Sequence, residues 1–437
     1  MSRDRTESIL LFLWKNFDLI LCFLFFLLIL HMFYPGLMSP DSVSQLRDAI
    51  TGNFSDWHPP VMSATWKLTN KFVFGPFGML IFHNLMFSLS LSLFIRYVTK
   101  KVWLRCLYML IIGFMPSIFS QLGVIWKDVG FSASLFLASS ILLFSLKKPW
   151  FAVLSLPPLF YGAAVRYNSW LAIFPICIWI AEACPAVWLS KYKRFKIFLI
   201  GTVVFCGLLV SVCVMNAILV KGKNSKVEQI VPLVDLAGMT AVRKEMLIPI
   251  PFLEKQDLTA KDISDVCFPA NCGFSFLDNK YHLIDCNAAY KRELFRVWLN
   301  SIIRYPKSYL KCRALYFARL LGIAKQVFYP YQIGMADNPF GFNFVPGRLS
   351  RLFYRGISKI SNSIIFRGWF YMVLGLLVFA SSIVYENRPA FFVSASGLLY
   401  GAGYFFCAPA FDFRFLYWTV LASYLSTILL LRTKVPK

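Results

Sequence analysis

Long apolar runs separated by short polar loops dominate the chain. A helix needs about 20 apolar residues to cross the hydrocarbon core of a membrane. About ten runs approach that length, near residues 15–34, 76–95, 104–121, 129–146, 150–165, 170–188, 197–219, 368–385, 389–407 and 413–431. The run at 17–34 is too long for a signal-peptide core and no small-residue cleavage site follows, so we interpret it as a retained first span. The pattern predicts an all-α polytopic membrane protein with about ten transmembrane helices.

The runs divide the chain into three parts. We expect an N-terminal transmembrane module at 1–220 with about seven spans and a C-terminal module at 367–437 with about three. Between them, 221–366 is predicted to be a small, mostly helical insertion. Apolar residues at helical spacing, with Lys and Arg between them, predict two amphipathic helices broken at Pro306, lying on the bilayer surface or packed on the spans. We also expect interfacial helices in the first long loop, 35–75.

Basic residues give the predicted orientation. Only 15% of the chain is charged, below the roughly 25% of soluble domains, yet the formal net charge is +24. Nucleic-acid binding is one reading of that charge, but basic residues flanking spans explain it better, so we expect no nucleic-acid partner. One set of span ends holds Arg3, Arg5, Lys15, Arg96, Lys100, Lys101, Arg105, Lys147, Lys148, Lys191, Lys193, Arg194, Lys196, Arg388, Arg432, Lys434 and Lys437. The positive-inside rule therefore places both termini in the cytoplasm and the insertion outside.

This orientation sends the unusual polar stretches to one extracytoplasmic face. They are "SPDSVSQL" and "SDWHPP" in the first loop, "WKD" at 126–128, "VRYNSW" at 165–170 and "FDFRFLYW" at 411–418. The inner loops are short and merely basic. We therefore expect the functional site to lie on the outer face.

In the first loop, Asp41 is either a helix N-cap, a role that Ser39 also fits, or a general base near the membrane surface. Asp56 and His58 precede two prolines that stiffen the backbone. They form either a hydrogen-bonded pair or part of a divalent-cation site, for which Mg²⁺ or Mn²⁺ is left open. No cofactor is otherwise indicated.

Three cations lie on the same predicted face. Lys127 and Asp128 form either a local ion pair at a helix start or a phosphate-binding cation with its orienting carboxylate. Arg166 and Arg414 either extend to the interface or bind phosphate oxygens, which the guanidinium fork matches. Supporting roles are assigned to three further residues, Tyr167, Asn168 and Asp412, the last as a partner for Arg414.

Cysteine spacing adds little. "CFPANC" lacks histidines at zinc-finger spacing. If the insertion is extracytoplasmic, one or two disulfides are expected among Cys267, Cys272, Cys286 and Cys312, with the pairing open.

The order of these features resembles the GT-C superfamily of polyprenyl-phosphate-sugar-dependent glycosyltransferases. An initial span is followed by an outer loop with an early Asp, and further charged residues lie at the outer ends of later spans. The motifs that carry the likeness are "PDSVSQL…GNFSDWHPP", "WKD", "RYN", "DLAG" and "YPKSYLKCR", and the likeness runs from residue 1 to about 418. They look like a bacterial branch that modifies envelope glycans such as the O-antigen of lipopolysaccharide. The first loop departs from the protein mannosyltransferases because it lacks their Asp-Glu pair.

The resemblance implies an inverting transfer of a hexose or pentose from a polyprenyl-phosphate, such as undecaprenyl phosphate, to a glycan or lipid on the outer face of the bacterial inner membrane. Asp41 would be the base, and Lys127, Arg166 and Arg414 would hold the donor phosphate. Asp56 and His58 would lie near the acceptor or shape the loop. Sugar, acceptor and oligomeric state stay open.

Three alternatives compete with this hypothesis. A polymerase or ligase of lipid-linked glycans would share the spans and outer arginines but would not need the early Asp. A transporter or flippase of lipid-linked sugars would place charges at the midplane and show repeated halves, and the sequence shows neither. A non-catalytic scaffold is the last alternative.

Overall fold

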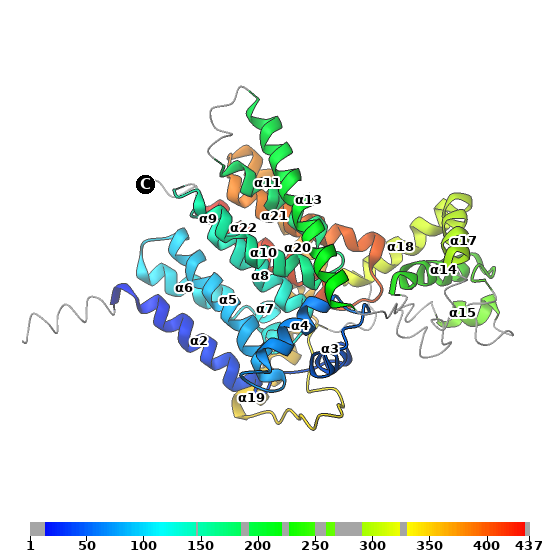
Figure 1. Cartoon of the computed structure of the whole chain (residues 1–437), viewed down its shortest axis with the longest axis horizontal. Helices are drawn as coiled ribbons and strands as arrows, with labels where there is room; N and C mark the ends of the chain where they lie inside the picture. Colours follow the sequence, from blue (N-terminus) through cyan, green and yellow to red (C-terminus); the bar gives the residue numbers. More distant parts are fainter. Residues whose placement is uncertain are drawn as a thin grey trace, which may run out of the picture.

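The computed structural model describes residues 14–145, 147–184, 192–220, 227–249, 259–266, 291–323 and 330–432. Within these ranges the chain is helical and has no β-strand, only isolated bridges that join Leu37 to Val124 and Phe54 to Val220. The predicted all-α class is therefore confirmed. A bundle of long helices has a smaller helical group beside it (Figure 1).

Helices from both ends of the chain build the bundle. The N-terminal ones are α2 (Phe17–Phe33), α5 (Pro76–Val98), α6 (Val102–Gly113), α7 (Pro116–Leu122), α8 (Lys127–Leu142), α9 (Trp150–Leu154), α10 (Leu156–Val165), α11 (Trp170–Glu182) and α13 (Lys193–Leu219). The C-terminal ones are α20 (Gly368–Val384), α21 (Arg388–Cys407) and α22 (Tyr417–Arg432). Since α21 packs on α11, and α22 packs on α8, the two predicted modules share one core.

Four helical segments are long and apolar enough to cross a membrane: Pro76–Val98, Lys193–Leu219, Arg388–Cys407 and Phe413–Arg432. The pair α6 and α7, bent by 70° at its break, makes a fifth if it counts as one span. Every predicted span contains a helix, but the others are shorter, such as α2 with 17 residues. A transmembrane-like helical protein is thus supported, and the number ten stays a prediction.

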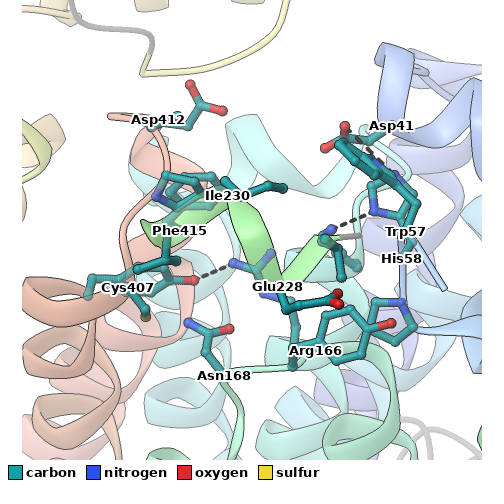
Figure 2. Close-up of a pocket in the computed structure, with 18 of the residues that line it drawn as sticks. Asp41, Trp57, His58, Arg166, Asn168, Glu228, Ile230, Cys407, Asp412 and Phe415 are labelled. Atoms are coloured by element: carbon teal, nitrogen blue, oxygen red, sulfur yellow. Dashed lines mark hydrogen bonds and ion pairs between the residues drawn. The ribbon is translucent and has the colours of Figure 1, made fainter. Parts of the chain in front are cut away.

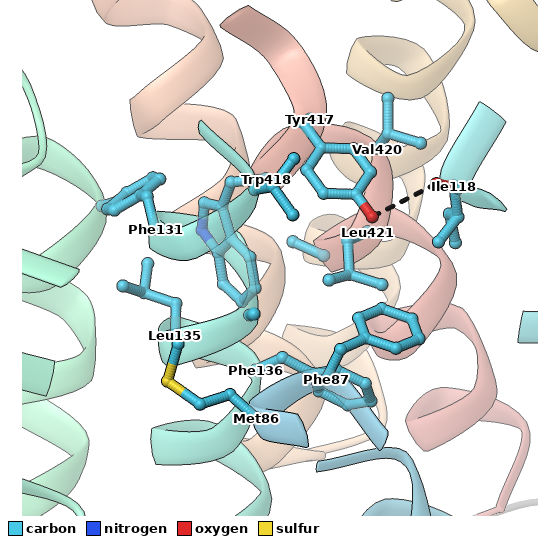
Figure 3. Close-up of a cluster of buried hydrophobic side chains, with 14 of the residues drawn as sticks. Met86, Phe87, Ile118, Phe131, Leu135, Phe136, Tyr417, Trp418, Val420 and Leu421 are labelled. Atoms are coloured by element: carbon cyan, nitrogen blue, oxygen red, sulfur yellow. Dashed lines mark hydrogen bonds between the residues drawn. The ribbon is translucent and has the colours of Figure 1, made fainter. Parts of the chain in front are cut away.

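Close packing holds the bundle centre together. Side chains of α5, α7, α8 and α22 meet there, among them Phe87 and Phe136, whose rings lie edge to face at 5.6 Å (Figure 3). The Tyr417 hydroxyl donates to the Ile118 carbonyl at 3.3 Å. Lipid tails are as apolar as these side chains, so packing and hydrogen bonds, more than water exclusion, favour association of spanning helices.

The first loop folds into two short helices, α3 (Pro40–Thr51) and α4 (Pro60–Thr69). Ser39, and not Asp41, is the N-cap of α3, with Pro40 at the first helical position. Gly52 ends α3 in the left-handed region, with φ of 72°. The Asp41 side chain is therefore available for other contacts.

Hydrogen bonds fasten the start of α3 to the segment before α8. The Ser42 hydroxyl donates to the Ile125 carbonyl at 2.7 Å, and the Trp126 indole donates to the Ser39 hydroxyl at 3.0 Å. The Ile125 N–H donates to the Leu37 carbonyl at 2.9 Å. These bonds, which we call the α3–α8 tether, fix Asp41 beside the "WKD" segment.

The insertion is helical where it is described. Its elements are η1 (Val227–Gln229), α14 (Ile230–Arg243), α15 (Ala260–Val266), α17 (Lys291–Arg304), α18 (Pro306–Leu320), α19 (Arg348–Ile360) and η5 (Ile364–Phe366). The break at Pro306 is where the sequence predicts it. Cys267, Cys272 and Cys286 lie outside the described residues, while Cys312 is buried and forms no disulfide within the described part.

A buried ion pair organises the smaller helical group. Asp235 on α14 and Arg313 on α18 are both fully buried, with Oδ1 and Nε 2.6 Å apart. The Trp298 indole on α17 donates to the second Asp235 oxygen at 2.9 Å. Two motifs noted in the sequence, "DLAG" and "YPKSYLKCR", therefore meet. Arg313 also donates to the Ala408 carbonyl at 3.3 Å, which joins the insertion to the end of α21.

The elements predicted for the outer face lie on one side of the bundle. In Figure 1, α3, α4, α14 and α19 lie away from the end that carries the C-terminus. This arrangement is compatible with the predicted orientation. Which side faces outward stays a prediction.

Candidate functional site

A cavity of about 670 Å³ opens where α3, the loop before α4, the starts of α8 and of the insertion, the end of α10 and the segment before α22 meet. The predicted site residues that line it are Asp41, Asp56, His58, Lys127, Arg166, Tyr167, Asn168, Asp412 and Arg414. Asp128 pairs with Arg166 behind the lining. Figure 2 shows Asp41 and His58 on one side and Asp412 and Phe415 on the other.

Asp41 contributes a carboxylate to this cavity. Its Oδ2 lies 3.0 Å from Arg414 Nη2, and its Oδ1 lies 3.8 Å from His58 Nε2. The side chain is 33% exposed, so the carboxylate is both paired and reachable from the cavity.

His58 lies between Asp41 and Lys127. Lys127 Nζ lies 2.9 Å from His58 Nδ1, and the His58 side chain is only 6% exposed. The sequence left open an Asp56–His58 pair and a local Lys127–Asp128 pair. In the structure His58 lies against Lys127 and Asp41, and the shortest contact of Asp128 is to Arg166.

Arg166 is held by a buried polar cluster. Its Nη2 lies 2.6 Å from Asp128 Oδ1, with side-chain exposures of 6% and 1%. The guanidinium also donates to Tyr404 and, at 3.4 Å, to the Tyr400 hydroxyl. It faces the Phe415 ring at 5.3 Å. Arg166 thus lines the cavity, while Asp128, which does not line it, compensates the guanidinium charge.

Arg414 bridges two carboxylates. Its Nε donates to Asp412 Oδ2 at 3.0 Å, as the sequence suggested, while Nη2 pairs with Asp41. The guanidinium also lies over the Trp126 ring at 4.8 Å. Its Nη1 is buried and has no hydrogen-bond partner among the described residues, so its N–H groups remain to donate to a ligand oxygen.

The "RYN" segment, which follows α10, forms one wall of the cavity. The Tyr167 hydroxyl donates to the Asp56 backbone carbonyl at 2.7 Å, which ties the end of α10 to the "DWHPP" loop. Asn168 lines the same wall. Tyr167 and Asp56 therefore shape the loop that presents His58.

The charges around the cavity set two protonation states. Burial opposes ionisation of Asp41, but Arg414, Lys127 and His58 outweigh it and hold the pKa of the carboxyl below its usual range. Burial and the nearby Lys127 charge lower the pKa of His58 to about 3, against the opposite effect of Asp41. At neutral pH the cavity therefore contains an ionised Asp41 and a neutral His58.

Sequence reasoning missed several lining residues. Tyr404 lies in an apolar helix four positions after Tyr400, a spacing that places both hydroxyls on one face of α21. Those two phenols, rare polar positions in that helix, were the available signal. Glu228, Val227 and Ile230 are the insertion's contribution to the wall, and no sequence pattern indicated that this segment approaches the cavity.

Within the described ranges, no three His, Cys, Asp or Glu side chains come together as metal ligands. The carboxylates of Asp41 and Asp412 are both directed at Arg414. The possibility of a divalent cation stays a prediction, and the chemistry below assigns it no step.

Fold and site together define a helical, membrane-type protein with a charged cavity at one end of its bundle. Comparisons with protein-family models, curated proteins and solved structures find no significant match to this chain. The likeness to GT-C glycosyltransferases therefore depends on the sequence motifs alone, and function has to be argued from the cavity.

Proposed function

We propose that this protein is an inverting glycosyltransferase of the GT-C type. It moves a sugar from a polyprenyl-phosphate donor to an envelope glycan or lipid on the outer face of the bacterial inner membrane. The observation that carries the proposal is the meeting of Asp41, Lys127, Arg166 and Arg414 around one cavity of about 670 Å³. These residues come from segments far apart in the sequence.

Asp41 is suited to act as the general base. As the acceptor oxygen attacks the anomeric carbon, its O–H bond breaks and the proton passes to the Asp41 carboxylate. The carboxylate is ionised and partly exposed to the cavity. A carboxylate with a lowered pKa is a weak base, but a donor phosphate bound nearby offsets the surrounding cations and raises its proton affinity.

The cations are suited to the leaving group. Attack breaks the bond between the anomeric carbon and the phosphate oxygen, and the electron pair stays on the phosphate, which gains negative charge. Preorganised cations stabilise such charge without protonating it. Lys127 is best placed among the three, because its hydrogen bond goes to neutral His58 and an ammonium has further N–H bonds to offer. Arg414 adds the unpaired N–H groups of Nη1. Arg166 adds a guanidinium at the cavity wall, with its charge compensated by Asp128.

The test compares envelope glycans by mass spectrometry in a bacterium that carries the gene, in a deletion strain, and in the deletion strain complemented with variants. We expect the deletion to remove one sugar from a glycan or lipid, and Asp41→Asn to fail to restore it. Asp48→Asn is the matched control, since Asp48 lies on the same helix and contacts Ser55, outside the cavity lining.

Membrane abundance and detergent stability of each variant have to match the wild type. Identical glycans in the deletion strain would argue against glycosyl transfer. Full complementation by Asp41→Asn would remove Asp41 from the chemistry.

A further inference from the structure

We propose that His58 is a positioning residue that links the phosphate-binding Lys127 to the base Asp41, through a single imidazole tautomer with the proton on Nε2. This inference deepens the glycosyl-transfer proposal and rests on it for the roles of Lys127 and Asp41. It assigns His58 no proton transfer.

The tautomer follows from the chemistry of the two partners. A lysine ammonium carries three N–H donors and has no acceptor. Lys127 Nζ lies 2.9 Å from His58 Nδ1, so Nδ1 has to accept and the ring proton has to be on Nε2. That Nε2 is buried and has no hydrogen-bond partner in the described residues.

The Nε2–H faces the base. Asp41 Oδ1 is 3.8 Å away, too far for a hydrogen bond, which needs about 3 Å. The other carboxylate oxygen already pairs with Arg414. A shift of under about 1 Å when substrate fills the cavity would complete a second contact to Asp41. The carboxylate would then be held at both oxygens in one orientation.

The loop holds the imidazole in place. Pro59 and Pro60 follow His58, and Pro60 begins α4. On the other side, Tyr167 fixes the Asp56 carbonyl. The ring therefore has its position set by the backbone and its tautomer set by Lys127.

Charged groups from several elements face this ring. Lys127 on α8, Arg414 before α22 and Arg166 after α10 disfavour its protonation, while Asp41 on α3 favours it. Burial is the largest cause that keeps the ring neutral at neutral pH, and the three cations add to it against the opposite effect of Asp41. Removal of Lys127 eliminates both the strongest of these opposing charges and the hydrogen bond that selects the tautomer.

Nitrogen NMR tests the inference without any turnover. The full-length protein is labelled with ¹⁵N-histidine in nanodiscs, and the His58 signals are identified by their loss in His58→Asn. We expect the Nε2–H tautomer in the wild type, with the ring unprotonated from about pH 5 to 7, where Lys127, whose pKa burial lowers to about 8, is still an ammonium. In Lys127→Met the pKa of the ring should rise, because one opposing charge is lost while burial remains, whereas Lys71→Met, an exposed lysine after α4, should leave that pKa unchanged.

Titration with undecaprenyl phosphate then links the ring to the donor site. We expect the Nδ1 signal to shift in the wild type and not in Lys127→Met. An Nδ1–H tautomer, an imidazolium at pH 7, or a lysine-independent ring would overturn the positioning role even if the protein transfers sugar. The expected NMR pattern without any sugar transfer would sustain the Lys127–His58–Asp41 link and discard the glycosyltransferase instead.

A pair of amide variants separates the two ring nitrogens once turnover can be measured. Asn places its amide near Nδ1, and Gln places its amide near Nε2. His58→Asn should retain the donor KM and lose kcat by about tenfold, whereas His58→Gln should retain more kcat and raise the donor KM by about tenfold. Equal losses in both parameters for both variants, with unchanged folding, would contradict the division of roles.

Discussion

Replacing Asp128 by Asn should destabilise the protein by removing the charge that compensates Arg166. The two side chains are almost fully buried and 2.6 Å apart. Asn retains the shape and an acceptor oxygen but removes the negative charge, so that the partners left to the guanidinium, including the hydroxyls of Tyr400 and Tyr404, are neutral. Breaking a buried pair by removing one partner costs about 3–5 kcal/mol. Since the hydroxyls still accept hydrogen bonds, we expect a loss of about 3 kcal/mol in the free energy of unfolding.

Thermal unfolding in nanodiscs, at one fixed scan rate, measures this loss as a lower midpoint. The matched control is Glu182→Gln, because Glu182 pairs with the exposed Arg388 at 2.7 Å and such pairs contribute at most about 1 kcal/mol. The double variant Asp128→Asn/Arg166→Met should be less destabilised than the sum of its singles. Additive effects, or an Asp128→Asn midpoint equal to that of the control, would refute the view of a coupled buried pair.

Three further outcomes follow from the structure. Gly238→Ala should lower the unfolding midpoint, since the new Cβ would lie 2.1 Å from the buried Cys312 thiol. Such an overlap typically costs about 1–3 kcal/mol. Gly356→Ala, where the new Cβ has nothing within 4 Å, should leave the midpoint unchanged. The unfolding free energy should fall as pH drops from about 6.5 towards 3, because His58 binds its proton more readily in the unfolded chain. The loss is about 2 kcal/mol by pH 5. A His58→Asn protein with the same acid sensitivity would exclude this cause. In a background without reactive thiols, Val345→Cys should react with an impermeant reagent from outside intact cells and Lys148→Cys only from inside, and the reverse pattern would invert the predicted orientation.

The sequence could predict which residues gather in the cavity but not how they pair. Apolar periodicity and basic loops sufficed to put Asp41, Lys127, Arg166 and Arg414 on one predicted face, and the structure brings them to one cavity. Nearest-neighbour reasoning offered a local Lys127–Asp128 pair as one of two alternatives. The actual partners come from other helices, since residues adjacent at a helix start point in directions about 100° apart.

The number of membrane-spanning helices was harder to predict, for a different reason. Hydropathy finds apolar runs, but length decides whether a helix crosses a membrane, and helix ends depend on local breaks. The run at 104–121 divides into α6 and α7 because Pro116 begins a new helix, and the two axes diverge by 70°. The wall formed by Glu228 was beyond prediction because it depends on how the insertion folds back onto the bundle.

The α3–α8 tether has a mechanical consequence. It joins the segments that bear Asp41 and Lys127 into one rigid unit, through the hydrogen bonds of Leu37, Ser39 and Ser42 to residues 125 and 126. A change in cavity width that leaves those bonds intact would therefore be confined to the other walls, to which η1 and the start of α14 contribute. The spacing between the Asp41 carboxylate and the Lys127 ammonium would then stay constant while those walls move.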